Sequence, residues 1–271
     1  MRTLACLSLL LIAVAAPAAV VQPIGASYEL LIPAAGSTAG VNGTFFRSDI
    51  SIVNLADHRQ NVIVEWLPQP GGTYQFAYFV IPPKSGIRSA DFVKDYLNTS
   101  GVGSIVVTAM TGPEATPLPI TDPTGKLFVS SRIWTPQPGT NGTTSQSLPA
   151  IPVAGINNTQ VGIYAMTGID DPPSYRTNIG VVNLDPVNPQ TFAVTWGPPL
   201  GAPIQTGTAF TLPPNTMVQL SGLAACCTNP ISVTNITPPD TRSTQWTAYG
   251  STINNVTGDA WDEIAVPITA P

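Results

Sequence analysis

The strongest constraint on the fold of this chain is that its sequence repeats once. The segment FRSDISIVNL at 46–55 is matched by YRTNIGVVNL at 175–184, at an offset of 129 residues (47 to 176). Downstream, VIVEW at 62–66 matches FAVTW at 192–196, where the offset has grown by one residue in an intervening turn. Turns tolerate such insertions. We therefore predict two copies of one module of about 120 residues, a normal size for a single domain.

Each copy has the residue pattern of antiparallel β structure. Short runs of β-branched and aromatic residues alternate with polar ones and are separated by clusters of Pro, Gly and Asn. Val62, Val64 and Trp66 share one face of a predicted strand, and large apolar residues keep this face in the copy that ends at Trp196. That face should look into the core, which places Glu65 on the surface.

Several short strands per copy predict an all-β fold of two tandem antiparallel β-sandwiches, immunoglobulin-like or fibronectin-like in architecture. The strand motif F/Y-R-S/T-D/N-I-x-I/V-V-N, present at 46–54 and 175–183, resembles that of uncharacterised secreted bacterial proteins with tandem β-sandwich modules. This resemblance implies the fold and brings no activity with it. The predicted modules span 20–147 and 148–271, and the turn-rich segment 136–155 is either a linker or a long loop that caps the first module.

The amino terminus has the features of a secretory signal peptide, predicted to span residues 1–19. A basic residue, Arg2, precedes an apolar run that is shorter than the ~20 residues of a bilayer span, and small residues follow. No later segment is long and apolar enough to cross a membrane. We expect the mature chain to be secreted, extracellular or periplasmic, without a membrane span.

The composition narrows the class of protein further. The 29 prolines and 23 glycines disfavour long helices, and charged residues make up 9% of the chain, against a usual share of about 25%. With a net charge of -5 and ten Lys and Arg in total, the chain lacks the basic surface that nucleic-acid binding requires.

Two adjacent cysteines, Cys226 and Cys227, follow the predicted signal peptide. Neighbouring Cα atoms lie about 3.8 Å apart, less than the roughly 4.4–6.8 Å usual for a disulfide, so a ring between them would be strained. A vicinal disulfide, two small buried apolar residues and a link to another chain are the three alternatives.

No catalytic or metal-binding constellation is predicted, and no cofactor. His58 is the sole histidine of the sequence and lies in a predicted turn, where it is expected to face water, and no G-x-S-x-G motif supplies a nucleophile. Carboxylates in predicted loops of the second module could supply oxygen ligands for calcium, but they lack the D-x-D-x-D-G spacing. They are Asp170, Asp171, Asp185, Asp259, Asp262 and Glu263.

Some repeated residues are predicted to be structural. Arg47 and Arg176 start matching strands, where a guanidinium can bind backbone carbonyls or a carboxylate and tie two strands together. Binding of a ligand is the alternative role. Asn54 and Asn183 are expected to close their strands with Asx-type turns, while Trp66 and Trp196 fill the cores.

Three aromatic residues, Tyr74, Phe76 and Tyr78, share one face of a predicted strand. An exposed aromatic stripe could bind a sugar or another protein, although core packing is the commoner fate of such side chains.

Three hypotheses for function follow. The first is a non-enzymatic secreted or cell-surface protein for adhesion or structure, with surface proteins or glycans as partners. The second is a self-assembling fibre or layer subunit, in which the segment 20–32 adds as a strand to a neighbouring sheet. The third is a carbohydrate-binding accessory module that uses its surface aromatics.

Overall fold

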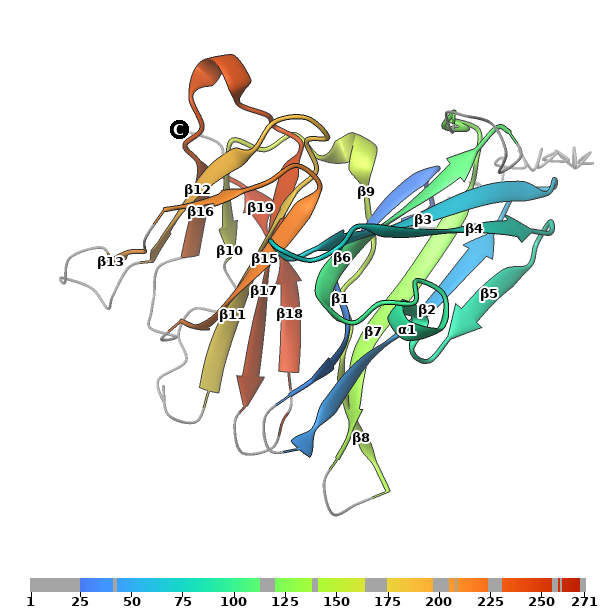
Figure 1. Cartoon of the computed structure of the whole chain (residues 1–271), viewed down its shortest axis with the longest axis horizontal. Coiled ribbons are helices and arrows are strands. Elements are labelled where there is room, and N and C mark those ends of the chain that lie inside the picture. The colour runs from blue at the N-terminus through green and yellow to red at the C-terminus, as the bar shows by residue number, and fades with distance from the viewer. Residues whose placement is uncertain are drawn as a thin grey trace, which may run out of the picture.

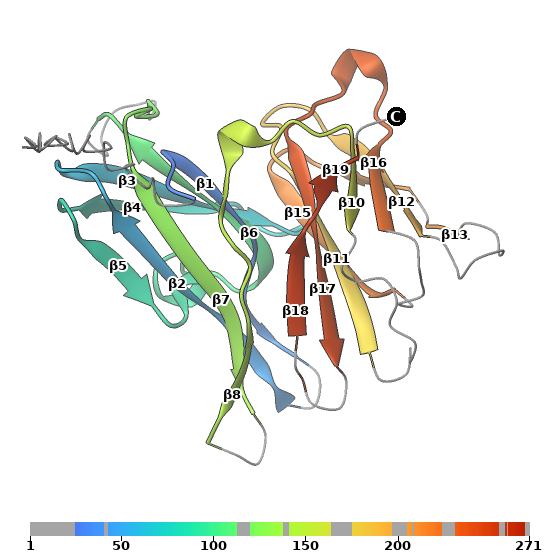
Figure 2. The ribbon, with the colours of Figure 1, turned by 180° about the vertical axis from the view of Figure 1, so that it is seen from behind.

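The computed structural model describes residues 25–40, 43–112, 120–137, 141–163, 175–196, 205–207, 209–223, 231–254, 258 and 260–268. Over these residues the chain is nearly all β, as predicted, and its antiparallel strands form two halves that pack side by side (Figures 1 and 2). The α-helix of the described ranges, α1 (Phe92–Asp95), is a single turn, as expected for a chain whose composition disfavours long helices. No helix in the described ranges has the length and apolarity needed to cross a bilayer.

The first half carries the strands that come before residue 153. They pair in the order β4-β3-β6-β1-β2-β7-β8, with β5 on β2 and β9 on β1. The strands are β1 (Glu29–Ala39), β2 (Phe45–Asn54), β3 (Gln60–Pro68), β4 (Gln75–Ile81), β5 (Gly86–Ser89), β6 (Gly101–Met110), β7 (Leu127–Pro136), β8 (Thr143–Gln146) and β9 (Ile151–Pro152).

Strand β1 joins the two layers of this half, so its strands form one continuous sheet rather than the two separate sheets of a simple sandwich. Along one edge β1 pairs with β6, and along the other it pairs with β9 and then β2. Its register shifts between Ile32 and Ala35, where Pro33 has no N–H to give to the ladder. The Ser104 hydroxyl donates to the Pro33 carbonyl oxygen at 2.6 Å and thereby holds the irregular stretch against β6.

The second half forms a sandwich of two sheets. One has the order β13-β12-β16-β10-β19 with β14 on β12, and the other the order β15-β11-β17-β18. The strands are β10 (Gln160–Ile163), β11 (Tyr175–Asn183), β12 (Gln190–Trp196), β13 (Gln205–Thr206), β14 (Phe210–Leu212), β15 (Thr216–Leu223), β16 (Ile231–Asn235), β17 (Trp246–Asn254), β18 (Ala260–Ile264) and β19 (Val266–Pro267).

Each half has its own apolar core, built from the strand faces that alternation predicts. Val62, Val64 and Trp66 are buried in the first core, and Trp66 is only 1% exposed. In the second core the matching strand contributes buried Phe192 and Val194, with the partly buried Trp196 packed against them. Glu65 lies on the opposite face of β3 and is partly exposed.

A third apolar cluster, here called the shared core, lies between the two halves. It is formed by the outer faces of β1, β3 and β6 in the first half and of β11, β15 and β17 in the second. These strands are buried on both faces. In the sequence of β6, apolar residues therefore follow one another almost without a break instead of alternating with polar ones. The principal members are Leu31, Leu67 and Val106 in the first half and Val182, Met217 and Tyr249 in the second.

The described part of the segment 136–155 is neither a free linker nor a simple loop. It carries β8, which pairs with β7, and β9, which pairs with β1. This segment therefore extends the sheet of the first half before the chain enters β10.

Candidate functional site

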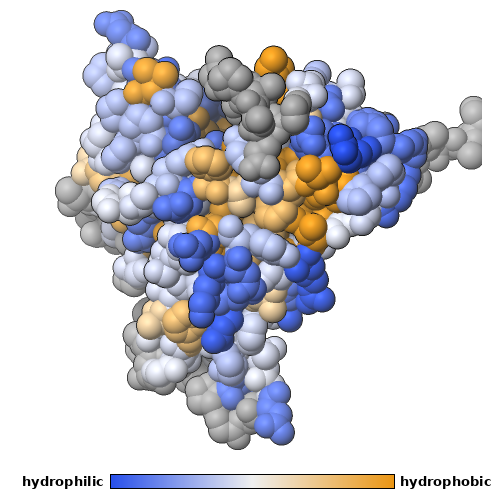
Figure 3. Space-filling view, turned by 45° about the vertical axis from the view of Figure 1, so that its right-hand side comes forward, coloured by the Kyte–Doolittle hydropathy of each residue, from blue (hydrophilic) through white to orange (hydrophobic). Residues whose placement is uncertain are grey.

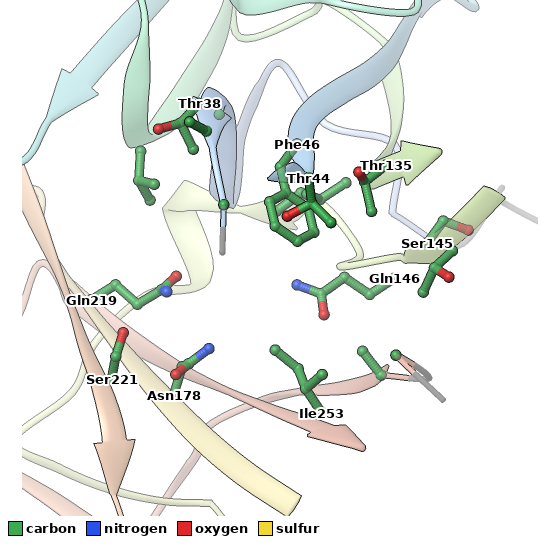
Figure 4. Close-up of a pocket in the computed structure, with 18 of the residues that line it drawn as sticks. Thr38, Thr44, Phe46, Thr135, Ser145, Gln146, Asn178, Gln219, Ser221 and Ile253 are labelled. Atoms are coloured by element: carbon green, nitrogen blue, oxygen red, sulfur yellow. The ribbon is translucent and has the colours of Figure 1, made fainter. Parts of the chain in front are cut away.

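A cavity of about 870 Å³ lies between the two halves and is here called the cleft (Figure 4). Its walls come from β1, β2, β7 and β8 on one side and from β11, β15, β17 and β18 on the other. This volume lies in the range of roughly 300–1,000 Å³ that is typical of ligand pockets. The lining is rich in hydroxyl groups, contributed by Thr38, Thr44, Thr135, Thr144, Ser145 and Ser221.

Side-chain amides form the second polar element of the cleft. The Tyr249 hydroxyl donates to Oε1 of Gln219 at 3.0 Å, and the Ser251 hydroxyl donates to Oε1 of Gln146 at 3.1 Å. Both amide oxygens are therefore engaged by hydroxyls of β17, which leaves the amide nitrogens to face the cleft (Figure 4). Two groups from different halves are thus oriented by one strand.

Asn178 is the most buried of the cleft amides. It lies in β11, is 7% exposed, and its Oδ1 atom is buried without a hydrogen-bond partner among the described residues. A buried polar atom without a partner costs about 1–3 kcal/mol. Protein atoms enclose this oxygen, so the amide nitrogen is the atom through which Asn178 could bind a ligand (Figure 4).

The same motif position is used differently in the two copies. Asp49, which matches Asn178, accepts hydrogen bonds from Arg88 and Arg132 at 2.7–3.0 Å. The bonds from Arg88, and then those from Arg132, hold the pKa of Asp49 below its usual value despite its burial. The first copy therefore satisfies this position with ion pairs, whereas the second copy turns it toward the cleft.

The aromatic residue among those described in the cleft lining is Phe46. Its ring is partly buried and lies against Gly40, where an added Cβ would come within 2.4 Å of the ring. Ile133 of β7 and Ile253 of β17 lie on the same lining. The cleft thus combines an apolar platform with uncharged hydrogen-bonding groups.

A buried carboxylate, Asp262, lies on one of the strands that contribute to the cleft but is not itself part of the lining. It lies in β18 opposite Ser251, and burial raises its pKa to about 6. The nearby Ser251 hydroxyl opposes this shift, but it donates its proton to Gln146. Neither Asp262 oxygen has a hydrogen-bond partner within the described part of the chain. The predicted place of Asp262 and Glu263 in a loop is wrong, because strand pairing with β17 extends to residue 264.

The two repeated arginines lie in different surroundings. Arg47 contacts the Asp91 carboxylate at 3.5 Å, donates to the Phe45 carbonyl oxygen at 3.4 Å, and lies over the rings of Phe45 and Trp134. These contacts lie within the first half, and the structural role of Arg47 stays a prediction. Arg176 lines the cleft.

The predicted aromatic stripe lies at the edge of the first sheet, with Phe76 and Tyr78 on β4 and Tyr74 directly before this strand. Tyr74 and Phe76 are 42% and 52% exposed, and their ring centroids lie 6.1 Å apart, while Tyr78 is partly exposed and 5.4 Å from Phe76. The Tyr74 hydroxyl donates to Glu65, and burial together with this carboxylate raises the pKa of Tyr74. Hydrophobic residues also gather near the middle of the face shown in Figure 3.

Other predicted residues lie away from the cleft or outside the described residues. His58 is exposed in the turn between β2 and β3. Asp185 accepts backbone hydrogen bonds from Val187 and Asn188 in a turn. Within the described residues no group of three or more His, Cys, Asp or Glu could hold a metal ion. The residues outside the described part are Asp170, Asp171, Cys226, Cys227 and Asp259.

Sequence reasoning missed Gln146, Asn178 and Gln219. Only Asn178 carried a signal, because it replaces an aspartate in an otherwise repeated motif. The two glutamines lie in polar stretches that resemble any solvated strand edge.

A scan against protein-family models found no match to this chain, and a search of curated proteins found none either. The cleft is therefore interpreted from its own residues.

Proposed function

We propose that this chain is a non-enzymatic secreted or cell-surface adhesion protein, whose two repeated β-sandwich halves hold a ligand in the cleft between them. The observation that carries this proposal is the cleft itself. It is a cavity of about 870 Å³ whose polar groups come from both halves. Cavities between structural units are common ligand sites.

The chemistry of the lining favours binding over catalysis. General acid–base catalysis uses carboxylates, imidazoles, amines, phenols or thiols. The described residues that line the cleft are apolar, hydroxyl-bearing or amide-bearing, with Arg176 as the charged side chain among them. Such groups form hydrogen bonds with a ligand without exchanging protons with it.

A carbohydrate-binding accessory module is the second candidate function. The exposure of Tyr74 and Phe76 at the start of β4 favours it, because aromatic rings left open to solvent can stack on sugar rings.

The hypothesis of fibre assembly by strand addition loses its proposed donor segment. Residues 29–32 of that segment belong to β1, which pairs with β6 on one edge and with β9 on the other within the same chain.

The proposed function can be tested by filling the cleft. Ser221 lines the cleft and is exposed, so Ser221→Trp should place an indole in it, whereas Ser130→Trp adds the same bulk on an exposed part of β7 outside it. Binding would be measured against a panel of immobilised glycans, extracellular-matrix proteins and the chain itself. We expect at least tenfold weaker binding for Ser221→Trp and wild-type binding for Ser130→Trp. Equal binding by both variants would contradict the proposal.

A further inference from the structure

Three amide side chains from both halves point into the same space of the cleft. They belong to Gln146 on β8, Asn178 on β11 and Gln219 on β15 (Figure 4). Hydrogen bonds from Ser251 and Tyr249 fix the two glutamines by their oxygens. The cleft therefore presents amide nitrogens as donors from three strands.

The hydroxyl groups of the lining can accept hydrogen bonds as well as donate them, and they include those of Thr38, Ser145 and Ser221. A carboxylate or phosphate could accept from the amide nitrogens but could not donate to these hydroxyl oxygens. A ligand hydroxyl can do both, so the pattern fits a ligand that carries several hydroxyls.

The charge of the lining also favours a neutral ligand. Arg176 is the charged residue among those described in the lining. The cleft therefore lacks the cluster of cations that would recognise a sulfate or phosphate group.

A platform for the apolar face of such a ligand lies in the same cavity. The Phe46 ring packs against Gly40 and lines the cleft together with Ile133 and Ile253. A sugar presents C–H groups on its faces and hydroxyls around its rim, which matches a flat aromatic surface beside a ring of amides and hydroxyls.

An extended peptide is the other class of ligand that both donates and accepts hydrogen bonds. Such a peptide is usually bound through its main chain along an open sheet edge. Asn178 lies on β11, both edges of which are paired, with β15 and β17. The polar groups that converge here are side chains from separate strands. This arrangement suits a compact ring better than an extended backbone.

We propose that the cleft binds a neutral saccharide, whose hydroxyls pair with Gln146, Asn178 and Gln219 and one of whose rings stacks on Phe46. This inference rests on the proposed function, because it names the ligand of the same cleft.

The test uses the full secreted chain on an array of neutral, sialylated and sulfated oligosaccharides, with affinities measured by calorimetry for the saccharides retained. We expect binding of neutral saccharides, weakened at least tenfold by Gln146→Ala, Gln219→Ala or Phe46→Ala. Gln69→Ala, which removes an amide outside the cleft, should bind like the wild type. Gln146 is partly exposed at a sheet edge, so its variant keeps the test valid if Asn178→Ala fails to fold.

The outcomes separate this inference from the proposed function. Binding of charged glycans or peptides alone, no glycan binding, or full binding by the amide variants would overturn the saccharide assignment. If Ser221→Trp still abolishes the binding of another ligand in the panel, the proposed function stands and only the saccharide assignment fails. If Ser221→Trp leaves every interaction unchanged, both proposals fail.

Discussion

Asn54 and Asn183, at an offset of 129 residues (54 to 183), make the same set of hydrogen bonds in the two halves. Each side-chain nitrogen donates to three backbone carbonyl oxygens, at 2.8–3.2 Å for Asn54 and 2.9–3.3 Å for Asn183. Each Oδ1 accepts from the backbone N–H two residues ahead. This equivalence supports the sequence repeat, which predicted both residues as strand-closing asparagines.

Replacing either asparagine by alanine should destabilise the protein. Both residues are fully buried, so the loss of the amide leaves several carbonyl oxygens without a donor. We expect the free energy of unfolding to fall by roughly 1–3 kcal/mol for Asn54→Ala and for Asn183→Ala. Urea unfolding monitored by tryptophan fluorescence measures this. Asn141→Ala, at an exposed position, should change stability by less than about 0.5 kcal/mol. A similar small change at all three sites would refute the structural role.

Gly180→Ala should also be costly, because the buried Tyr249 ring packs directly on Gly180. An added Cβ would lie 1.8 Å from the ring atom Cε1, so the ring must move within the shared core. Overpacking of this kind costs about 1–3 kcal/mol. Thermal unfolding should show a lower Tm for Gly180→Ala, whereas Gly155→Ala, where an added Cβ meets nothing within 4 Å, serves as the control. An unchanged Tm would mean that the ring does not lie on this glycine.

Asp262→Asn should stabilise the protein at neutral pH but not in acid. Burial raises the pKa of Asp262 to about 6 from an ordinary 3.8, so the folded state holds the proton more tightly than the unfolded state. Stability therefore falls as the pH rises between these values, and above about pH 6 the full penalty is present. At about 1.4 kcal/mol per pKa unit, the asparagine should add roughly 2–3 kcal/mol at pH 7.5 and little near pH 3.5.

This pH dependence is best measured as a difference between wild type and variant. Asp49 and Asp185 have lowered pKa values, so their contribution to stability increases with pH instead of decreasing. Both residues are present in the wild type and in the variant, so their contributions cancel in the difference. Asp240→Asn, at an exposed carboxylate, controls for the loss of surface charge. A gain of the same size at both pH values would show that ionisation of Asp262 is not the cause.

Arg47→Lys should lower the Tm by a few degrees. The lysine ammonium cannot reproduce both the stacking on Phe45 and Trp134 and the contact with Asp91. We therefore expect the free energy of unfolding to fall by roughly 1 kcal/mol. Differential scanning calorimetry would compare it with Arg59→Lys in an exposed turn. The repeat predicts a lower Tm for Arg176→Lys as well. A wild-type Tm for Arg47→Lys would argue against a structural role.

Local patterns predicted the parts of this fold that depend on local physics. The alternation at Val62, Val64 and Trp66 identified a core face, because side chains of a strand point alternately to its two sides. Composition and turn chemistry likewise predicted antiparallel β structure.

The arrangement of the halves could not be read from the same patterns. Leu31 and Val106 look like ordinary strand residues, and nothing local shows that their outer faces meet Met217 and Tyr249 across the shared core. The cleft depends on that meeting, so Gln146 and Gln219 gained a role only once the strands were placed in space. The double pairing of β1 is also non-local, although Pro33 marks where its ladder is interrupted.

The shared core has a consequence for how a ligand would enter. Two domains joined by a polar contact move as a hinge, and a ligand then has to offset the loss of that freedom when it closes them. Here fully buried Leu31, Val182 and Met217 hold the two walls together through apolar contact. The binding geometry is thus preorganised before any encounter, and affinity would be governed by how slowly the ligand leaves rather than by a closing motion.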